Sequence, residues 1–204
     1  MNADSDLIAQ DKKRLRLRAG RQRDTISLAT ASLAAEKLTH WIDALLAVTP
    51  KPVVAAGYWP LRSEIDPRPL MAALATKGAN VGLPRMEGSE APLSFHDLQP
   101  DMELVAGAFG VYEPLPSADP LTPNLILAPL LAFDRSGGRL GYGKGFYDRT
   151  LFRLNRAGDP LLVIGLAFAS QEVDQVPRSP TDYLLDGVLT EKGLVLFSPA
   201  RALP

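Results

Sequence analysis

The sequence contains no cysteine and only two histidines, His40 and His96. The absence of cysteine excludes disulfide bonds, thiol nucleophiles and cysteine-ligated zinc sites. Neither histidine lies in a recognisable motif, and no serine stands in a nucleophile context, so a hydrolytic triad is disfavoured as well. We therefore interpret both histidines as structural or surface groups.

A strong net charge and a long apolar run are also missing. The formal net charge is −1, so an anionic ligand must be held by a local basic cluster and not by the field of the whole protein. No apolar run is long enough to span a bilayer, and the first residues lack the apolar centre of a secretory signal. We expect a cytoplasmic protein whose partners include neither bulk nucleic acid nor a membrane.

The composition that is present is that of a folded domain. Hydrophobic residues make up 46% of the 204 residues and charged residues 22%, a balance far from that of disordered chains. A domain of this length buries about 70% of the surface that its unfolded chain exposes. The expectation is a single domain over residues 1–204, acting as a monomer.

Helical and extended patterns alternate along the chain. The periodicity predicts helices over 7–23, 29–46, Asp66 to Gly78, and 146–155. It predicts short strands over 53–58, 80–83, 93–95, 125–128, 161–167 and 187–189. Strands that alternate with helices indicate an α/β fold with a mainly parallel, covered sheet. The Pro- and Gly-rich stretch 107–123 is predicted to be a surface loop.

The segment 125–148 carries the strongest functional signal. An apolar strand leads to a glycine at every second position of 141–145, and a helix starts directly after them. Glycines let backbone N–H groups converge on phosphate oxygens, and a helix N-terminus adds partial positive charge. Arg139 and Lys144 bring full charges to the same place, and Asp148 could hold magnesium. The alternative is that the glycines only form a sharp turn and that Asp148 caps the helix.

The G-x-G-x-G spacing matches neither a Walker A loop nor a Rossmann fingerprint. However, Arg139-Leu-Gly-Tyr-Gly-Lys-Gly-Phe-Tyr-Asp148, preceded by Ala132-Phe-Asp134 and Gly138, resembles the signature of the 5-formyltetrahydrofolate cyclo-ligase family. Three further segments resemble that family in the expected order: Lys12-Lys-Arg-Leu-Arg16, Gly57-Tyr-Trp-Pro-Leu-Arg-Ser-Glu-Ile-Asp66 and Val176-Pro-Arg-Ser-Pro-Thr-Asp-Tyr-Leu-Leu-Asp-Gly-Val188. Together the matching segments extend over nearly the whole chain.

The resemblance implies a role for individual residues. The implied ATP-binding residues are Lys12, Arg16, Arg139, Gly141, Tyr142, Gly143, Lys144, Gly145, Tyr147 and Asp148. The implied folate-binding residues are Trp59, Glu64, Phe109, Tyr142 and Phe146. The implied catalytic residues are Arg139 and Lys144, the implied magnesium ligands are Asp148 and Asp182, and Asp186 matches a structural aspartate. An ionised Glu64 could accept two N–H groups of a pterin ring. Phe146 stands where the family often has tyrosine.

The implied reaction is the cyclisation of 5-formyltetrahydrofolate to 5,10-methenyltetrahydrofolate with ATP and Mg²⁺. In it the formyl oxygen attacks the γ-phosphorus of ATP, N10 closes the ring, and phosphate and ADP are released. The implied fold is the three-layer α/β/α arrangement shared with ribose-5-phosphate isomerase and coenzyme A transferases. The protein would mainly position the reactants and neutralise charge.

Without the resemblance, several of these residues have plainer interpretations. Glu64 would be a surface carboxylate, Phe109 a core or loop side chain, and Asp182 a turn residue after Pro180. Two other functions stay open. The helix 7–23 could bind nucleic acid or a protein partner through its basic residues, which are Arg14, Arg16, Arg18, Arg21 and Arg23. A homologue of the same fold could instead bind folate without turnover, or use ATP on another small molecule.

Overall fold

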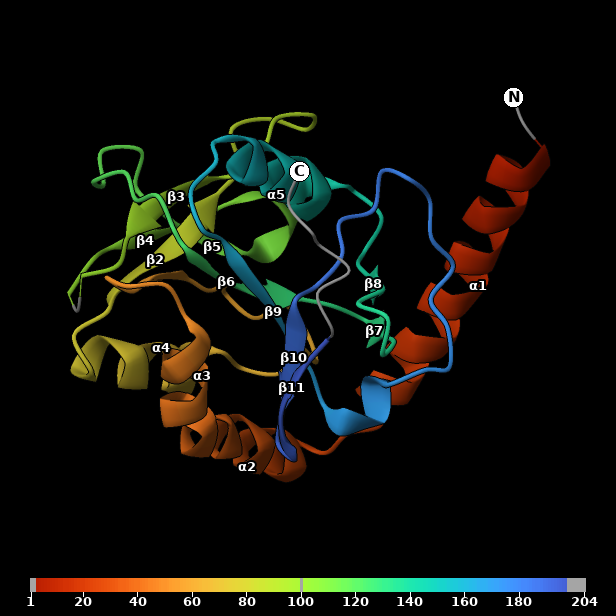
Figure 1. Cartoon of the computed structure of the whole chain (residues 1–204), viewed down its shortest axis with the longest axis horizontal. Coiled ribbons are helices and arrows are strands. Elements are labelled where there is room, and N and C mark those ends of the chain that lie inside the picture. The colour runs from red at the N-terminus through yellow and green to blue at the C-terminus, as the bar shows by residue number, and fades with distance from the viewer. Residues whose placement is uncertain (1–2, 100, 198–204) are drawn as a thin grey trace.

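The computed structural model describes residues 3–99 and 101–197, and its centre is a twisted seven-stranded sheet with helices on both faces (Figure 1). The helices are α1 (Ala3–Asp24), α2 (Leu28–Leu38), α3 (Ile42–Val48), α4 (Arg68–Thr76) and α5 (Phe146–Arg156). The strands of the main sheet are β1 (Val54–Ala56), β2 (Asn80–Arg85), β3 (Ser94–Asp97), β6 (Leu125–Pro129), β9 (Leu162–Leu166), β10 (Gly187–Thr190) and β11 (Gly193–Leu196). Two small ribbons pair β4 (Leu104–Ala106) with β5 (Tyr112–Pro114), and β7 (Ala132–Phe133) with β8 (Arg139–Leu140).

The strand order in the main sheet is β11-β10-β9-β6-β1-β2-β3. The five strands from β10 to β2 run parallel, and only the edge strands β11 and β3 are antiparallel to their neighbours. Parallel strands need crossover connections, which the helices supply on both faces. This arrangement confirms the predicted three-layer α/β/α fold with a mainly parallel sheet.

The central strand β6 explains why the sheet is covered on both sides. Leu125 and Leu127 pack into the cluster formed with α2, α3 and α4, whereas Ile126 and Ala128 pack into the cluster formed with α5. All four side chains are fully buried. A continuous apolar run, which is what this strand shows in the sequence, is typical of a strand buried on both faces.

Several element boundaries differ from the sequence predictions. The helix predicted over 29–46 is wrong as a single element, because a 3₁₀ turn at Thr39–Trp41 separates α2 from α3. The Thr39 hydroxyl donates to the Glu36 carbonyl, a local bond that competes with regular helix continuation. The stretch 107–123 is not a plain loop, since it contributes β5 to a ribbon. The ribbons and β11 were not predicted, because strands of two to four residues carry little periodicity.

The parallel arrangement places the ends of neighbouring strands together. The segment 57–66 follows β1, and the segment that carries Asp182 follows β9. Residues 141–145, called the glycine segment below, follow β6 by way of the β7–β8 ribbon. Since β1, β6 and β9 are adjacent, these three segments meet at one edge of the sheet, the place where open α/β folds bind ligands. No helix within 3–99 or 101–197 combines the length and the apolar character that a membrane span requires.

Candidate active site

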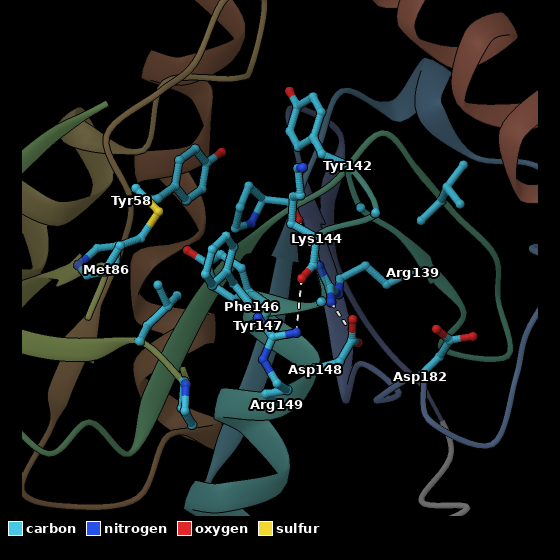
Figure 2. Close-up of a pocket in the computed structure, with 18 of the residues that line it drawn as sticks. Tyr58, Met86, Arg139, Tyr142, Lys144, Phe146, Tyr147, Asp148, Arg149 and Asp182 are labelled. Atoms are coloured by element: carbon cyan, nitrogen blue, oxygen red, sulfur yellow. Dashed lines mark hydrogen bonds and ion pairs between the residues drawn. The ribbon is translucent and has the colours of Figure 1, made fainter. Parts of the chain in front are cut away.

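A cavity of about 1140 Å³ lies at this edge of the sheet. Its wall is built by α1, by the segments that follow β1, β2, β6 and β9, by the β4–β5 ribbon and by the start of α5 (Figure 2). All the site residues predicted from the sequence line this cavity: Lys12, Arg16, Trp59, Glu64, Phe109, Arg139, Gly141, Tyr142, Gly143, Lys144, Gly145, Phe146, Tyr147, Asp148 and Asp182. Residues that are far apart in the chain therefore share one site.

The glycine segment forms a narrow loop that leads directly into α5. Gly143 and Gly145 have φ angles of 92° and 69°, a region that side chains disfavour. A Cβ atom on Gly143 would lie 3.0 Å from Cζ of Arg16, and Arg16 Nε donates to the Gly141 carbonyl at 2.9 Å. The loop is thus held against α1 so closely that a side chain at position 143 would have to displace Arg16.

Arg139 and Asp148 form an ion pair in the wall of the cavity (Figure 2). The Arg139 guanidinium lies 2.9 Å from Asp148 Oδ1, which also accepts the backbone N–H of Tyr183 at 3.1 Å. Within the described residues, Arg139 Nε and the Tyr147 hydroxyl are buried without a hydrogen-bond partner. Because an unpaired buried donor costs free energy, these groups are suited to receive a polar ligand from the cavity.

Asp182 lies on the neighbouring segment and pairs with a cation from α1. Lys12 Nζ donates to Asp182 Oδ1 at 2.7 Å, and the Ser179 N–H donates to Oδ2 at 2.6 Å. Burial alone would raise the pKa of Asp182, but the hydrogen bonds from Lys12 and Ser179 outweigh it and lower this pKa. The carboxylate is therefore ionised at neutral pH. The Tyr183 amide bonds to Asp148, so the two carboxylates lie on directly connected segments.

Aromatic rings and one buried carboxylate form another part of the cavity wall. Glu64 is 9% exposed, and its Oε2 accepts the Leu61 N–H at 2.7 Å. Burial raises the pKa of Glu64, and the Leu61 N–H and the charge of Arg23 act in the opposite direction. Burial likewise raises the pKa of the Tyr142 hydroxyl to about 12. Trp59 packs on Tyr112 with 5.4 Å between ring centroids.

Comparison with known proteins now adds to this geometry. A model of the 5-formyltetrahydrofolate cyclo-ligase family matches residues 8–191. The chain belongs to this family. It is 35% identical over 191 residues to a 5-formyltetrahydrofolate cyclo-ligase of Mycolicibacterium smegmatis, an alignment that covers 90% of this chain and 95% of the relative. It is 33% identical over 139 residues to the Haemophilus influenzae protein of the same name, covering 66% and 73%.

Solved structures agree with the family assignment. The NMR structure of Aquifex aeolicus 5,10-methenyltetrahydrofolate synthetase superposes with a TM-score of 0.73 at 30% identity, covering 95% of this chain and 96% of that one. A 5,10-methenyltetrahydrofolate synthetase from Mycoplasma pneumoniae superposes with a TM-score of 0.66 at 23% identity, covering 89% and 99%, and shows the same fold. The predicted family and the α/β architecture are confirmed.

Two of the expected cyclo-ligase residues sit at the open rim of the cavity. Phe109 is 62% exposed and has a φ of 60°, a conformation that costs a residue with a side chain of order 1–3 kcal/mol. Lys144 Nζ lies 5.7 Å from the centre of the Phe109 ring. The ring therefore lines the cavity next to Lys144 of the glycine segment, and it is not a core side chain.

Some cavity residues escaped the sequence analysis. Arg149 donates to the Lys144 carbonyl at 3.0 Å (Figure 2), and the Tyr58 hydroxyl donates to the Ile65 carbonyl at 2.8 Å. Glu113 is buried 3.7 Å from Arg85, and burial raises its pKa. No pattern could have found Glu113, because it lies in the stretch taken for a loop. Arg149 follows the glycine signature directly, so its position was a usable signal.

Arg23 corrects one sequence hypothesis. As a candidate nucleic-acid contact it should be exposed, yet it is 3% exposed and bonded to Ser63, Leu130 and Tyr142. Arg16 is likewise engaged, with the Gly141 carbonyl. The spacing of the two arginines indicated this burial, since positions 16 and 23 lie seven residues apart and therefore on the same face of a helix.

Proposed function

We propose that this cyclo-ligase family member converts 5-formyltetrahydrofolate to 5,10-methenyltetrahydrofolate and consumes ATP, releasing ADP and phosphate. The observation that supports the proposal is that one cavity contains two different chemical environments. One end is aromatic and holds the buried carboxylate of Glu64, and the other is glycine-lined and basic. A folate ring and a polyphosphate need these two environments side by side.

The basic end fits a nucleotide polyphosphate. Arg139, Lys144, Lys12 and Arg16 would neutralise its charge, and the amides of 141–145 would donate to phosphate oxygens. The unpartnered Arg139 Nε and Tyr147 hydroxyl support this fit, because a bound anion would give such donors an acceptor. Phosphoryl transfer from ATP would turn the formyl oxygen into a leaving group.

The donor chemistry of Asp148 and Asp182 fits Mg²⁺. Within the described part of the chain, no group of three or more His, Cys, Asp or Glu side chains could hold a metal ion by itself. Magnesium usually takes one or two protein carboxylates together with substrate phosphates and water, so two aspartates suffice. Mg²⁺ held there would neutralise charge on the polyphosphate.

The aromatic end fits the pterin ring of the folate. Ionised Glu64 would accept two ring N–H groups, a charge-assisted and directional contact, and Trp59, Tyr142, Phe146 and Phe109 would enclose the ring. The protein's contribution is then orientation of N10 towards the formyl carbon and exclusion of water. No cavity residue has to act as a general base in this scheme.

The test is direct conversion by the purified protein. 5-Formyltetrahydrofolate and Mg-ATP are mixed with the protein, and methenyl-folate formation is followed by its near-ultraviolet absorbance beside a reaction without ATP. ATP-dependent growth of the signal is expected. Folate binding without growth would favour a homologue that binds folate or acts on another substrate, and no folate binding would remove the proposal.

The remaining expectations are predictions of the same proposal. Arg14, Arg18 and Arg21 are exposed, so retention on DNA at low salt tests the nucleic-acid hypothesis. The monomeric state, the cytoplasmic location and the absence of nucleic-acid and membrane partners stay predictions from the sequence. The predicted single domain over residues 1–204 also stays a prediction.

A further inference from the structure

A buried cation lies behind the aromatic end of the cavity. Arg23 is near the C-terminal end of α1, is 3% exposed and does not line the cavity. Among the described residues, no carboxylate lies within ion-pairing distance of its guanidinium. An unpaired buried charge is costly, so an arginine at such a position calls for an explanation from its surroundings.

The guanidinium is held by three directed hydrogen bonds. Nε donates to Ser63 Oγ at 3.1 Å, one terminal nitrogen donates to the Leu130 carbonyl at 3.3 Å, and the other donates to the Tyr142 hydroxyl at 2.6 Å. Ser63 in turn donates to Asp24, the residue after Arg23. These bonds connect α1 to the segment that carries Glu64, to the end of β6 and to the glycine segment.

One partner of Arg23, Tyr142, lines the cavity, and another, Ser63, is next in the chain to a residue that does. Ser63 is the residue before Glu64, and Tyr142 lies between two of the glycines. The Tyr142 oxygen accepts from Arg23, which leaves its own proton free to point elsewhere. The hydrogen bond from the Tyr142 hydroxyl and the positive charge of Arg23 both act to lower the pKa of Glu64. Arg23 therefore acts on the cavity through Tyr142 and Glu64, which line it.

We infer that Arg23 is a positioning residue for the folate site, which orients Tyr142 and places a positive charge behind Glu64. This inference rests on the proposed function and deepens it. An ionised Glu64 accepts two N–H groups, whereas a protonated one has an O–H donor in the same place. The positive charge is placed where it favours the accepting form without occupying the cavity.

The groups that face Glu64 determine the expected direction of the pH effect. They are the hydroxyls of Tyr58, Tyr142 and Tyr147 and the guanidinium of Arg23. The three tyrosines are neutral at physiological pH, because the ordinary tyrosine pKa is about 10 and burial raises it further at each of them. Among these groups, Arg23 is the one that carries a charge. Removal of Arg23 raises the pKa of Glu64. When the pH is lowered, the variant should therefore lose folate affinity at a higher pH than the wild type does.

The experiment measures binding of 5-formyltetrahydrofolate by calorimetry from mildly acidic to mildly alkaline pH. For Arg23→Gln we expect affinity at mildly acidic pH to fall about tenfold, the loss that corresponds to weakening one charge-assisted contact. The deficit should shrink at alkaline pH, and Mg-ATP affinity should stay close to that of the wild type. Arg23→Lys keeps the charge but not the planar guanidinium. Its affinity should therefore be lower at every pH, but the pH range over which affinity falls on acidification (the acidic limb) should stay near that of the wild type.

Controls separate this role from a structural one. Arg21→Gln removes an exposed arginine of the same helix and should leave binding and its pH dependence unchanged. An Arg23→Gln protein with the wild-type acidic limb, or with equal losses for folate and Mg-ATP, would overturn the inference. If Arg23→Gln does not fold, Arg23→Lys is measured alone, and wild-type affinity for folate at every pH would overturn the inference as well.

The outcome also separates this inference from the proposed function. Wild-type protein that binds no folate at any pH contradicts the proposed function itself. Wild-type protein that binds folate with no acidic limb contradicts the role of an ionised Glu64, and with it the role of Arg23. Only a limb that moves in Arg23→Gln and stays in Arg23→Lys supports the inference.

Discussion

Asp134 shows how one side chain organises the loops above the sheet. It is 1% exposed, and its Oδ1 accepts from the Ser136 N–H at 2.8 Å and the Gly138 N–H at 3.0 Å. Its Oδ2 accepts from the Val176 N–H at 2.8 Å. A Cβ atom on Gly138 would lie against Oδ2, which explains the glycine that precedes the signature. One carboxylate thus joins the β7–β8 ribbon to the segment that leads to Asp182.

Asp134→Asn should destabilise the fold in a pH-dependent way. Burial raises the pKa of Asp134, but hydrogen bonds from Ser136, Val176 and Gly138 outweigh it and lower this pKa. A carboxyl with a lowered folded-state pKa stabilises the fold above its unfolded-state pKa, and this contribution is lost as pH falls through the folded-state pKa. The cost at neutral pH should be about 3 kcal/mol and should shrink below about pH 4.

Urea unfolding at neutral and acidic pH measures this difference. Asp43→Asn, which removes an exposed partner of Lys77, serves as the control and should cost about 0–1 kcal/mol. A cost of Asp134→Asn that is the same at both pH values would show that its ionisation is not linked to folding.

Asp148→Asn should reduce turnover by roughly a hundredfold and raise the Mg²⁺ requirement. Asparagine keeps an oxygen that can accept from Arg139 and Tyr183, but it lacks the charge that a divalent cation needs. The measurement is a magnesium titration of turnover, with Glu172→Gln, an exposed partner of Arg135, as the control. A wild-type magnesium requirement in Asp148→Asn would remove the aspartate from the metal site.

Among the elements, α1 has the widest reach. Lys12 and Arg16 bond to Asp182 and to the glycine segment at the proposed nucleotide end of the cavity, and Arg23 bonds to Tyr142 behind the proposed folate end. Figure 1 shows the helix beside the sheet, with its N-terminal end projecting away from the other elements. Because a helix is stiff over these 22 residues, one element fixes the distance between the two ends of the site.

The glycine segment gives the prediction at this scale. Gly143→Ala should raise the ATP concentration for half-maximal turnover about tenfold. The reason is that a strained φ and the contact with Arg16 together cost more than about 1 kcal/mol when the loop keeps its conformation. Gly158→Ala is the matched control, since its φ is 84° and nothing lies within 4 Å of the added Cβ. Both variants should lose stability, and only Gly143→Ala should change the ATP requirement. An equal ATP requirement in both would contradict the cradle.

At the scale of the whole molecule, the site exists because β1, β6 and β9 are neighbours in the sheet. The segments that follow these strands supply Glu64, the glycine segment and Asp182. The complete site is therefore assembled from several separate stretches of the chain. Ligands that contact all three segments hold them together in the folded state only. Their binding energy therefore adds to the free energy of unfolding.

5-Formyltetrahydrofolate with Mg²⁺ and a non-hydrolysable ATP analogue should raise the melting temperature. At one hundred times its Kd a ligand adds about 2.7 kcal/mol, which corresponds to roughly 5–10 °C for a chain of this size. The measurement is thermal unfolding followed by circular dichroism. Glu64→Ala should lose the shift with folate alone and keep the shift with the nucleotide. Loss of both would contradict separate ends of the site.

The sequence by itself determined the local chemistry. Its apolar run predicted β6 as a strand covered on both faces, its glycine spacing predicted a tight loop before α5, and its motifs predicted the family and the residues that line the cavity. These features are local because backbone conformation at a glycine and burial of a strand depend mainly on the residues at that position and beside it.

Only the tertiary structure decided which distant groups act together. The sequence placed Arg23 among exposed basic residues, whereas the docking of α1 buries it behind Glu64 and Tyr142. The short ribbons and the place of Glu113 likewise depend on contacts between elements. The physical reason is that burial and hydrogen-bond partners are set by strand order and helix docking, which bring together residues more than a hundred positions apart, such as Arg23 and Tyr142.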